Sequence, residues 1–356
     1  MNETNIQFIR QILATPGLSR AELSRIFEVN RSTCSYITKE LQEENLIVFR
    51  KEKNNGRLGQ YIYFNYDNEL LLCIELGKRK IKLFVVNLEG DIRYQENINI
   101  EAFSIDEQVV QIEQAINYII QKYPSIKNAI VAVHGTVDLQ SKYISSPFSG
   151  ITYTHLDTFF EKFNLDFQLI NESNAYTLGI IEKTPFSSGI SINIKDGVGA
   201  GIVIDSQLVL GANGIAGEIG HFIIDQNGRK CNCGNTGCIE LYISDTNTII
   251  ECRQKTLEPI RKKSVSDYYS RNAKVKNIFN RNLSYLGVLI NNMSLLLNPE
   301  FIFITSEVYS QIEDAQEILS NSLHSSNMQL SNLKILNYDE QSLIQGLCKS
   351  YLNNKY

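Results

Sequence analysis

The loop from Glu218 to Glu240 constrains this chain more than any other part of its sequence. It holds three of the seven cysteines, Cys231, Cys233 and Cys238, and one of the four histidines, His221. Three thiols and one imidazole form a donor set that suits tetrahedral zinc. Glycines between the cysteines let the backbone turn so that the thiols point at one ion. We therefore expect a structural Zn²⁺ on these four ligands, in a spacing unlike that of a zinc finger or ribbon.

Length and composition set broad limits on the protein. At 356 residues, the chain is long enough for two or three domains, each with its own core. No run of 18 apolar residues and no leader-like N-terminus is visible, so we expect a cytoplasmic protein with no membrane partner. An odd number of cysteines, three of them in one loop, also favours a reducing compartment over disulfide bonding.

The first 62 residues differ in charge from the rest of the chain. They carry nine Lys and Arg against seven Asp and Glu, a net charge of +2. The remainder carries 25 against 32, a net charge of −7. The overall charge of −5 argues against a nucleic-acid partner, but the first segment is an exception to it. The charge of this segment is only weak support for nucleic-acid binding. The pattern of helices and strands in the segment is a stronger criterion.

That first segment has the pattern of a helix-turn-helix. Apolar residues at helical spacing predict a helix over residues 3–14, which a Thr-Pro-Gly sequence ends. Ser19 and Glu22 form a capping box at the start of a short second helix. Asn30 caps a third helix, which we expect to run to about Glu44.

The third helix has an apolar stripe on one side and hydrogen-bonding side chains with two cations on the other. In a helix-turn-helix, side chains near the start of this helix contact base edges in the major groove. We therefore expect DNA contacts from Arg31, Ser32, Ser35, Tyr36 and Lys39, with Thr38 also facing outward.

A predicted β-hairpin follows the three helices. Leu46–Phe49 and Gln60–Phe64 have the pattern of its strands, and the ten residues between them contain four cations and two glycines. Such a tip is typical of a wing that lies against phosphates or the minor groove. The alternative is a small helical protein-interaction domain, but the element order and the basic hairpin favour DNA binding. We expect phosphate contacts from Arg50, Lys51, Lys53 and Arg57.

Strands, glycine turns and helices alternate in the rest of the chain. We expect strands at 68–87, 91–100, 129–133, 168–170, 190–194 and 197–204, and helices at 106–122 and from 171. Helices dominate from residue 249 onward, interrupted by one strand at 301–305. This order predicts two α/β lobes with a cleft between them. The expected domains are 1–66, 67–188 and 189–339, with a C-terminal helix over about 340–356 that returns to the first lobe.

Several motifs resemble those of the ROK family of repressors, open reading frames and sugar kinases. Glu218-Ile-Gly-His221 resembles the family's Glu-X-Gly-His motif. The run from Cys231 to Glu240 resembles its Cys-X-Cys-Gly-X-X-Gly-Cys-X-Glu signature, and Gly197–Gly201 is similar to its second glycine-rich loop. The resemblance covers essentially the whole chain. It implies an α/β protein, with a winged helix-turn-helix ahead of the two-lobed actin-like fold of sugar kinases and Hsp70.

The resemblance also implies a ligand site. In the family, the zinc holds the sugar site, and its histidine ligand also faces the sugar. The positions that match the family's sugar contacts are Asn171, Glu172, Glu218, His221 and Glu240.

Three departures from the family's kinases fall on nucleotide or catalytic positions. The first phosphate loop, Asp-X-Gly-Gly-Thr in the kinases, is Glu75-Leu-Gly-Lys-Arg79 here. The position of the kinases' catalytic aspartate is occupied by Glu172, whose side chain is one methylene longer. A misplacement of the catalytic carboxylate by about 1 Å can cost on the order of 100-fold in rate. The Gly-Gly pair after the 301–305 strand is Ser306-Glu307. We therefore expect a sugar sensor that has lost phosphoryl transfer, and not an enzyme.

The repressor branch of the family includes xylose, N-acetylglucosamine and glucose-uptake regulators. By this resemblance we expect a repressor that binds an inverted-repeat operator in double-stranded DNA and responds to a sugar effector in the cleft. We expect a homodimer, or a tetramer built from two dimers. Two alternatives stay open: an ATP-dependent hexokinase fused to a DNA-binding domain, and a repressor controlled by a partner protein.

Overall fold

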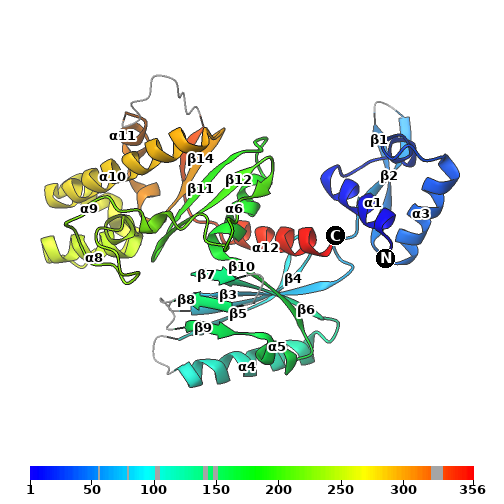
Figure 1. Ribbon diagram of the computed structural model, residues 1–356, viewed down its shortest axis with the longest axis horizontal. Coiled ribbons are helices and arrows are strands. Elements are labelled where there is room, and N and C mark those ends of the chain that lie inside the picture. The colour runs from blue at the N-terminus through cyan, green and yellow to red at the C-terminus, as the bar shows by residue number, and fades with distance from the viewer. Residues whose placement is uncertain (55–56, 78–79, 101–104, 139–142, 147–150, 322–331) are drawn as a thin grey trace.

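The computed structural model shows an N-terminal group of helices set beside a larger body made of two α/β lobes (Figure 1). It describes the whole chain except residues 55–56, 78–79, 101–104, 139–142, 147–150 and 322–331. Among the described residues, none of the helices combines the length and the apolar character that a membrane crossing requires.

The three predicted N-terminal helices are confirmed. They are α1 (Glu3–Ala14), α2 (Arg20–Ile26) and α3 (Arg31–Glu43). The Ser19–Glu22 capping box is present, and the Asn30 side chain accepts from the Thr33 backbone N–H at 2.8 Å. Apolar faces of the helices and the hairpin meet in one core, so the caps and the apolar stripe together fix this part.

The hairpin has longer strands than predicted. Strand β1 (Ile47–Asn54) pairs antiparallel with β2 (Arg57–Phe64), with Ile47 opposite Phe64 and Asn54 opposite Arg57. The expectation of a ten-residue tip from residue 50 to 59 was therefore wrong. Residues 50–53 of this ribbon are exposed to water, so charged side chains there are compatible with continued backbone pairing. Composition alone had suggested a loop.

The first lobe is built on a five-stranded sheet of order β10-β6-β3-β4-β5. Its strands are β3 (Leu70–Leu76), β4 (Lys80–Asn87), β5 (Ile92–Asn99), β6 (Asn128–Val133) and β10 (Asp166–Asn171). Side chains alternate between its faces: Leu72 and Ile74 pack with α4 (Ile105–Lys122) and α5 (Asp157–Glu161), whereas Leu71 and Cys73 pack on the opposite face. A small sheet, which the sequence analysis missed, joins β7 (Thr136–Asp138), β8 (Tyr143–Ser146) and β9 (Ile151–His155).

The second lobe has a five-stranded sheet of order β13-β12-β11-β14-β15. Its strands are β11 (Gly189–Ile194), β12 (Val198–Ile204), β13 (Gln207–Leu208), β14 (Phe301–Thr305) and β15 (Leu333–Leu336). The expectation of one strand after residue 249 was wrong, because β15 pairs parallel with β14. A four-residue strand at a sheet edge is too short to give a readable period. The helices of this lobe are α7 (Glu240–Ile243), α8 (Asp245–Thr256), α9 (Val265–Arg271), α10 (Ala273–Leu297) and α11 (Ala315–Asn321).

Two helices cross in direct backbone contact at the centre of the body. Helix α6 (Glu172–Ile181) packs against α12 (Glu340–Lys355), which Figure 1 shows running from the lobes toward the N-terminal part. A Cβ atom on Gly179 would lie 1.8 Å from the Ser342 carbonyl oxygen, and one on Gly346 would lie 1.7 Å from that of Ala175. Only glycine lets the two backbones approach this closely.

The two ends of α12 contact different parts of the protein. At its start, the Glu340 carboxylate lies 2.6 Å from the Lys82 ammonium on β4. At its end, the Tyr356 ring meets the Phe64 ring edge-on at 5.8 Å between centroids, and the Arg10 side chain donates to the Tyr356 carbonyl. The N-terminal part is therefore attached to the body through α12 as well as through the chain that follows β2.

Candidate functional site

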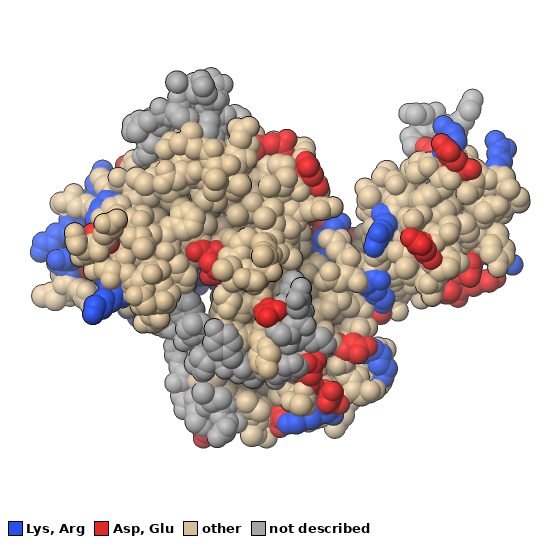
Figure 2. Space-filling model, in the orientation of Figure 1, with Lys and Arg blue, Asp and Glu red and all other residues tan. Residues whose placement is uncertain are grey.

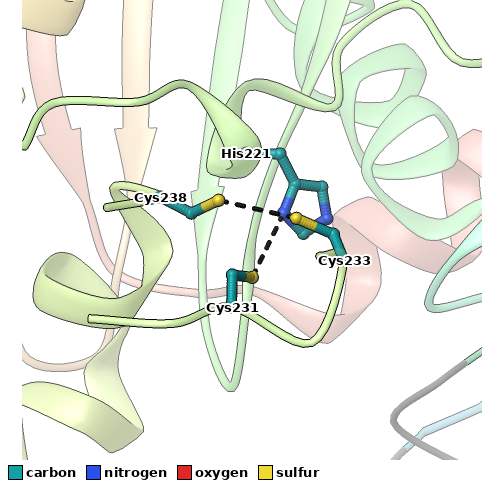
Figure 3. A group of neighbouring side chains, drawn as sticks. All are labelled: His221, Cys231, Cys233 and Cys238. Carbon is teal, nitrogen blue, oxygen red and sulfur yellow. Dashed lines mark hydrogen bonds between the residues drawn. The ribbon is translucent and has the colours of Figure 1, made fainter. Parts of the chain in front are cut away.

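The predicted metal ligands lie together. His221 ends a short 3-10 helix, η2 (Ile219–His221), and the loop that follows brings the three cysteines against its ring (Figure 3). The His221 Nδ1 atom lies 3.7 Å from the Cys231 sulfur, and the Cys233 and Cys238 sulfurs are 3.6 Å apart. The four ligand atoms all lie within 4.8 Å of one another, so His221, Cys231, Cys233 and Cys238 form a group that can hold a metal ion.

Glycine and hydrogen bonds shape this loop. Gly237 has a φ of +82°, and a Cβ there would lie 1.7 Å from the Asp225 carbonyl oxygen. Single β-bridges pair Ile223 with Cys238 and Lys230 with Thr236. These contacts turn the chain back on itself, which places the last cysteine beside the first two.

An arginine ties the same loop to the helices of the second lobe. The Arg229 guanidinium donates to the Glu251 carboxylate at 2.7 Å, and Arg281 donates to both oxygens of that carboxylate at 2.8 Å. Burial alone would raise the pKa of Glu251, but the two arginines lower it to about 2. The carboxylate therefore stays charged and joins the loop to α8 and α10.

A small cavity of about 90 Å³ lies beside the cysteine and histidine cluster. This cavity is lined by all five of the residues that we expect to contact a sugar. One of the five, His221, also belongs to the cluster, because its Nδ1 atom faces the Cys231 sulfur. The residues in question are Asn171, Glu172, Glu218, His221 and Glu240.

Asn171 has a structural role as well as a place in the cavity wall. Its side-chain oxygen caps α6, accepting from the backbone N–H groups of Ser173 at 2.8 Å and Asn174 at 3.3 Å. Its amide nitrogen donates to the Gly135 carbonyl at 2.8 Å and lies 3.5 Å from a Glu218 carboxylate oxygen. The cap therefore fixes this amide in the wall of the cavity.

The two carboxylates that flank the loop have different surroundings. Burial raises the pKa of Glu218, although the neighbouring His221 partly offsets the effect. The Glu240 carboxylate accepts from the Cys231 thiol at 3.2 Å and lies 3.5 Å from the His221 Nδ1 atom. Both carboxylates offer acceptors to a polar ligand, and Glu240 links the cavity to the cluster.

An ion-pair network in the cavity wall, built around buried glutamates, could not be read from the sequence. The Lys195 ammonium lies 3.0 Å from a Glu172 oxygen and 3.2 Å from a Glu75 oxygen. His134 contacts the same Glu75 oxygen at 3.0 Å, and Lys82 contacts the other oxygen at 3.0 Å. The available signal was a lysine two residues before the glycine-rich turn, but the pairing of this lysine with two glutamates depends on tertiary structure.

The positions that depart from the kinase pattern have partners within the protein. Glu75 and Glu172 belong to the ion-pair network, whereas Lys78 and Arg79 lie outside the described residues. The Ser306 hydroxyl donates to the Asp245 carboxylate at 2.6 Å, and the Glu307 backbone N–H donates to its other oxygen at 3.2 Å. Residues 306 and 307 are therefore held against the start of α8.

A larger cavity, of about 560 Å³, lies where the N-terminal part meets the body. Arg10 and Leu13 of α1, Asn174 of α6 and the last two turns of α12 contribute to its lining. Its walls carry amides, apolar groups and the charged side chains of Arg10, Asp205 and Lys349, whereas three glutamates and two histidines lie around the smaller cavity. The smaller cavity is therefore the better candidate for a polyhydroxylated ligand.

The structure exposes most of the side chains expected to contact DNA. Figure 2 shows Lys and Arg side chains, with Asp and Glu among them, on the surface of the N-terminal part. Tyr36 is 70% exposed, and Arg50 lies over the Tyr63 ring at 4.6 Å. The Arg57 side chain lies outside the described residues. The exposed candidates are Arg31, Ser32, Ser35, Tyr36 and Lys39 on α3, and Arg50, Lys51 and Lys53 on β1.

The expectation that Thr38 faces outward was wrong. Thr38 is fully buried. Its hydroxyl donates to the Cys34 carbonyl at 2.9 Å and accepts from the Arg20 side chain at 3.0 Å, so it needs no contact with water. A threonine can satisfy its own hydroxyl within a helix, so a polar side chain does not by itself mark the outer face.

The chain resembles a known repressor over most of its length and a known sugar kinase over a smaller part. The xylose repressor of Bacillus subtilis (strain 168) is 28% identical over 352 residues, covering 88% of this chain and 90% of the repressor. An N-acetylmannosamine kinase of Vibrio cholerae (El Tor Inaba N16961) is 27% identical over 239 residues, covering 65% of this chain and 82% of the kinase.

Two solved structures share the fold. One is a ROK family transcriptional regulator, a homolog of the E. coli MLC protein, with a TM-score of 0.81 and 21% identity over 98% of this chain and 96% of that one. The other is a ROK family glucokinase from Streptomyces griseus, solved with glucose and AMPPNP, with a TM-score of 0.67 and 20% identity. That match covers 79% of this chain and 98% of the glucokinase. At these identities the likeness concerns the fold alone.

Two family models match the sequence. The winged helix-turn-helix DNA-binding model covers residues 1–48, and the ROK family model covers residues 71–338. The predicted fold class, a winged helix-turn-helix followed by an actin-like sugar-kinase fold, is thereby confirmed. Since the second match takes in well over half of the sequence, the chain belongs to the ROK family.

Proposed function

We propose that this protein is a sugar-responsive transcriptional repressor that binds an inverted-repeat operator as a homodimer. One observation carries the proposal. A cavity whose lining includes the carboxylates of Glu172, Glu218 and Glu240 shares His221 with a metal-ligand cluster, on a chain that also has a winged helix-turn-helix. Carboxylates and amides are the groups that bind sugar hydroxyls. The xylose repressors among the relatives support xylose or a related sugar as the effector.

We propose Zn²⁺ as the ion of the Cys3His cluster. Zn–S bonds of about 2.3 Å in a tetrahedron place neighbouring sulfurs about 3.8 Å apart. The sulfur–sulfur distance of 3.6 Å and the nitrogen–sulfur distance of 3.7 Å support such an ion. His221 and the three cysteines would hold the ion, and its role would be to fix the His221 ring and Glu240 at the cavity wall.

We propose three functional parts: residues 1–66 for DNA, and 67–188 and 189–339 as the lobes around the cleft. The packing of α12 against α6 and the first sheet supports its assignment to the first lobe. The cavity between the lobes is smaller than the roughly 300–1,000 Å³ of common ligand pockets. A sugar would therefore have to separate the lobes. It can shift the equilibrium between the closed and the separated arrangement of the lobes only by the difference in its affinity for the two arrangements.

The same movement would change DNA binding in a dimer. Half-sites must lie one helical turn of DNA apart, about 34 Å, or a multiple of it. A modest rotation of the two N-terminal parts would then prevent simultaneous contact with both half-sites. A tetramer built from two such dimers is compatible with this arrangement.

We propose that the protein is not a kinase. Lys195 is paired with Glu172, the residue at the family's catalytic position, and Ser306 is hydrogen-bonded to Asp245. These contacts support a site that no longer carries out phosphoryl transfer. A coupled assay of ADP release over hexoses, pentoses and N-acetylhexosamines tests this, because turnover of ~1–100 per second is typical of kinases and would refute the proposal.

Ligand binding at the cavity can be tested with Glu240→Gln. The zinc-loaded wild type should show a higher melting temperature with one sugar of a panel. At a sugar concentration of 100 times Kd, binding should raise the free energy of unfolding by about 2.7 kcal/mol. Loss of a charged hydrogen bond costs about 1.5–3 kcal/mol, so the variant should bind that sugar roughly 10- to 100-fold more weakly. Glu89→Gln, at an exposed position, is the control and should bind as the wild type does. A wild type that responds to no sugar would favour control by a partner protein.

DNA recognition can be tested with Arg31→Ala. The operator is first selected from random double-stranded DNA, and its affinity is then measured by fluorescence anisotropy at fixed salt. A base contact by an arginine is worth about 1–3 kcal/mol, so binding should weaken roughly 5- to 100-fold, with relaxed preference at one position of each half-site. Lys162→Ala, on the first lobe, removes the same charge and should bind normally. An unchanged affinity and preference in Arg31→Ala would refute the assignment.

A further inference from the structure

Lys195 lies at a point where several carboxylates converge. Glu75 is near the end of β3, Glu172 begins α6, and Lys195 is in the turn between β11 and β12. The two glutamates are 3% and 4% exposed. The Lys195 ammonium lies between them and also sits over the Tyr338 ring at 4.0 Å. A lysine of the second lobe thus reaches across to two buried carboxylates of the first.

The groups around Lys195 form a donor set for a divalent cation. Glu75, His134 and Glu172 each offer a ligand atom, and these atoms lie within 4.8 Å of one another. Carboxylates are ligands that suit Mn²⁺, and imidazole is a common ligand of other divalent transition-metal ions. Mn²⁺ is therefore a suitable probe of this donor set. The set is reachable from solution, because His134, Glu172 and Lys195 all line the small cavity.

Lys195 supplies one of the two ammonium groups that face three carboxylates in this cluster. Glu75, Glu172 and Glu340 face the two ammonium groups of Lys82 and Lys195, with His134 beside them. Burial alone would lower the pKa of Lys195, but Glu172 and Glu75 hold it well above its usual range. Burial alone would likewise raise the pKa of Glu75, but Lys195 and His134 hold it well below its usual range. The ammonium and the carboxylate therefore both stay charged.

We propose that Glu75, His134 and Glu172 form a divalent-cation site whose occupant is the ammonium of Lys195. The lysine excludes divalent ions from the cleft and joins the two lobes by ion pairs that need no dissolved ion. Removal of this ammonium leaves two buried carboxylates without their shared partner, and a divalent ion can then offset the added negative charge. This inference is independent of the identity of the effector and of DNA binding.

The test compares Mn²⁺ binding by the zinc-loaded wild type and by Lys195→Ala. Unbound Mn²⁺ is followed by electron paramagnetic resonance, and occupancy of the Cys3His cluster is held constant by zinc. The variant should bind one more Mn²⁺ per chain than the wild type, with an affinity at least tenfold higher than any wild-type binding. Lys195→Arg keeps a cation in place and should behave as the wild type does.

Three results would overturn the proposal. One is equal Mn²⁺ binding by the wild type and Lys195→Ala. A second is Mn²⁺ binding that persists when Glu75→Gln is added to Lys195→Ala, because the ion would then lie elsewhere. If Lys195→Ala does not fold, refolding is repeated with Mn²⁺ and with Na⁺ alone. Recovery only with Mn²⁺ supports the site, and failure to recover in Mn²⁺ is the third overturning result.

Discussion

Cys233→Ser is expected to release the metal ion and to lower the melting temperature by more than any other single change near the cavity. Structural zinc contributes an apparent free energy of about 10–16 kcal/mol in small zinc-binding peptides, so even a fraction of this is large for one domain. Cys233 is the exposed member of the cluster, so replacement of its sulfur by oxygen leaves little packing defect. Metal content by plasma mass spectrometry and unfolding by calorimetry measure the two effects.

The sugar response should disappear together with the metal. His221 serves both the cluster and the cavity, so a loop without its ion no longer fixes the ring at the cavity wall. Asn232→Ala is the matched control, since it changes an exposed side chain between two of the ligands. It should keep its zinc and its response. A full sugar response in metal-free Cys233→Ser would separate the two sites and disprove their linkage.

Gly346→Ala is expected to destabilise the body by about 3 kcal/mol or more. The added methyl group would lie 1.7 Å from a carbonyl oxygen of α6, and neither helix backbone can move aside without disturbing the sheet on which both pack. Overpacking in a core costs about 1–3 kcal/mol and sometimes more, and this contact involves rigid main-chain atoms. Denaturant unfolding measures the loss.

The sign of this effect is informative by itself. In a helix without such a contact, Gly→Ala stabilises by about 1 kcal/mol, so destabilisation cannot come from helix propensity. Asn353→Ala, at an exposed position on the same helix, should be neutral or slightly stabilising. A Gly346→Ala protein as stable as the wild type would mean that the two helices do not pack backbone to backbone.

Local signals in the sequence were sufficient for the N-terminal helices and the metal-ligand cluster. Capping residues act within three or four positions of the chain, and the cysteines are separated by few residues, so little tertiary structure is needed to infer them. Thr38 shows the limit of this approach, because a side chain that bonds to its own helix looks the same in sequence as one that faces water.

Contacts between distant segments were not predictable from the sequence. Lys195 meets Glu75 across 120 positions, and Gly346 meets α6 across more than 160. The sequence around Lys195 and Gly346 contains no pattern that indicates which distant segment each residue contacts. Short edge strands such as β15 were missed for a related reason, since their pairing is set by the neighbouring strand and not by their own period.

The attachment of α12 at both ends has a consequence for how this chain could exchange parts with its relatives. A helix of 16 residues is about 24 Å long, and here one end pairs with Lys82 beside the cleft while the other contacts Phe64 and Arg10. The DNA-reading segment is thus not a freely transferable module. A chimera that received a foreign winged helix would also need the last turn of the donor's final helix, or the graft would lose its fixed orientation on the body.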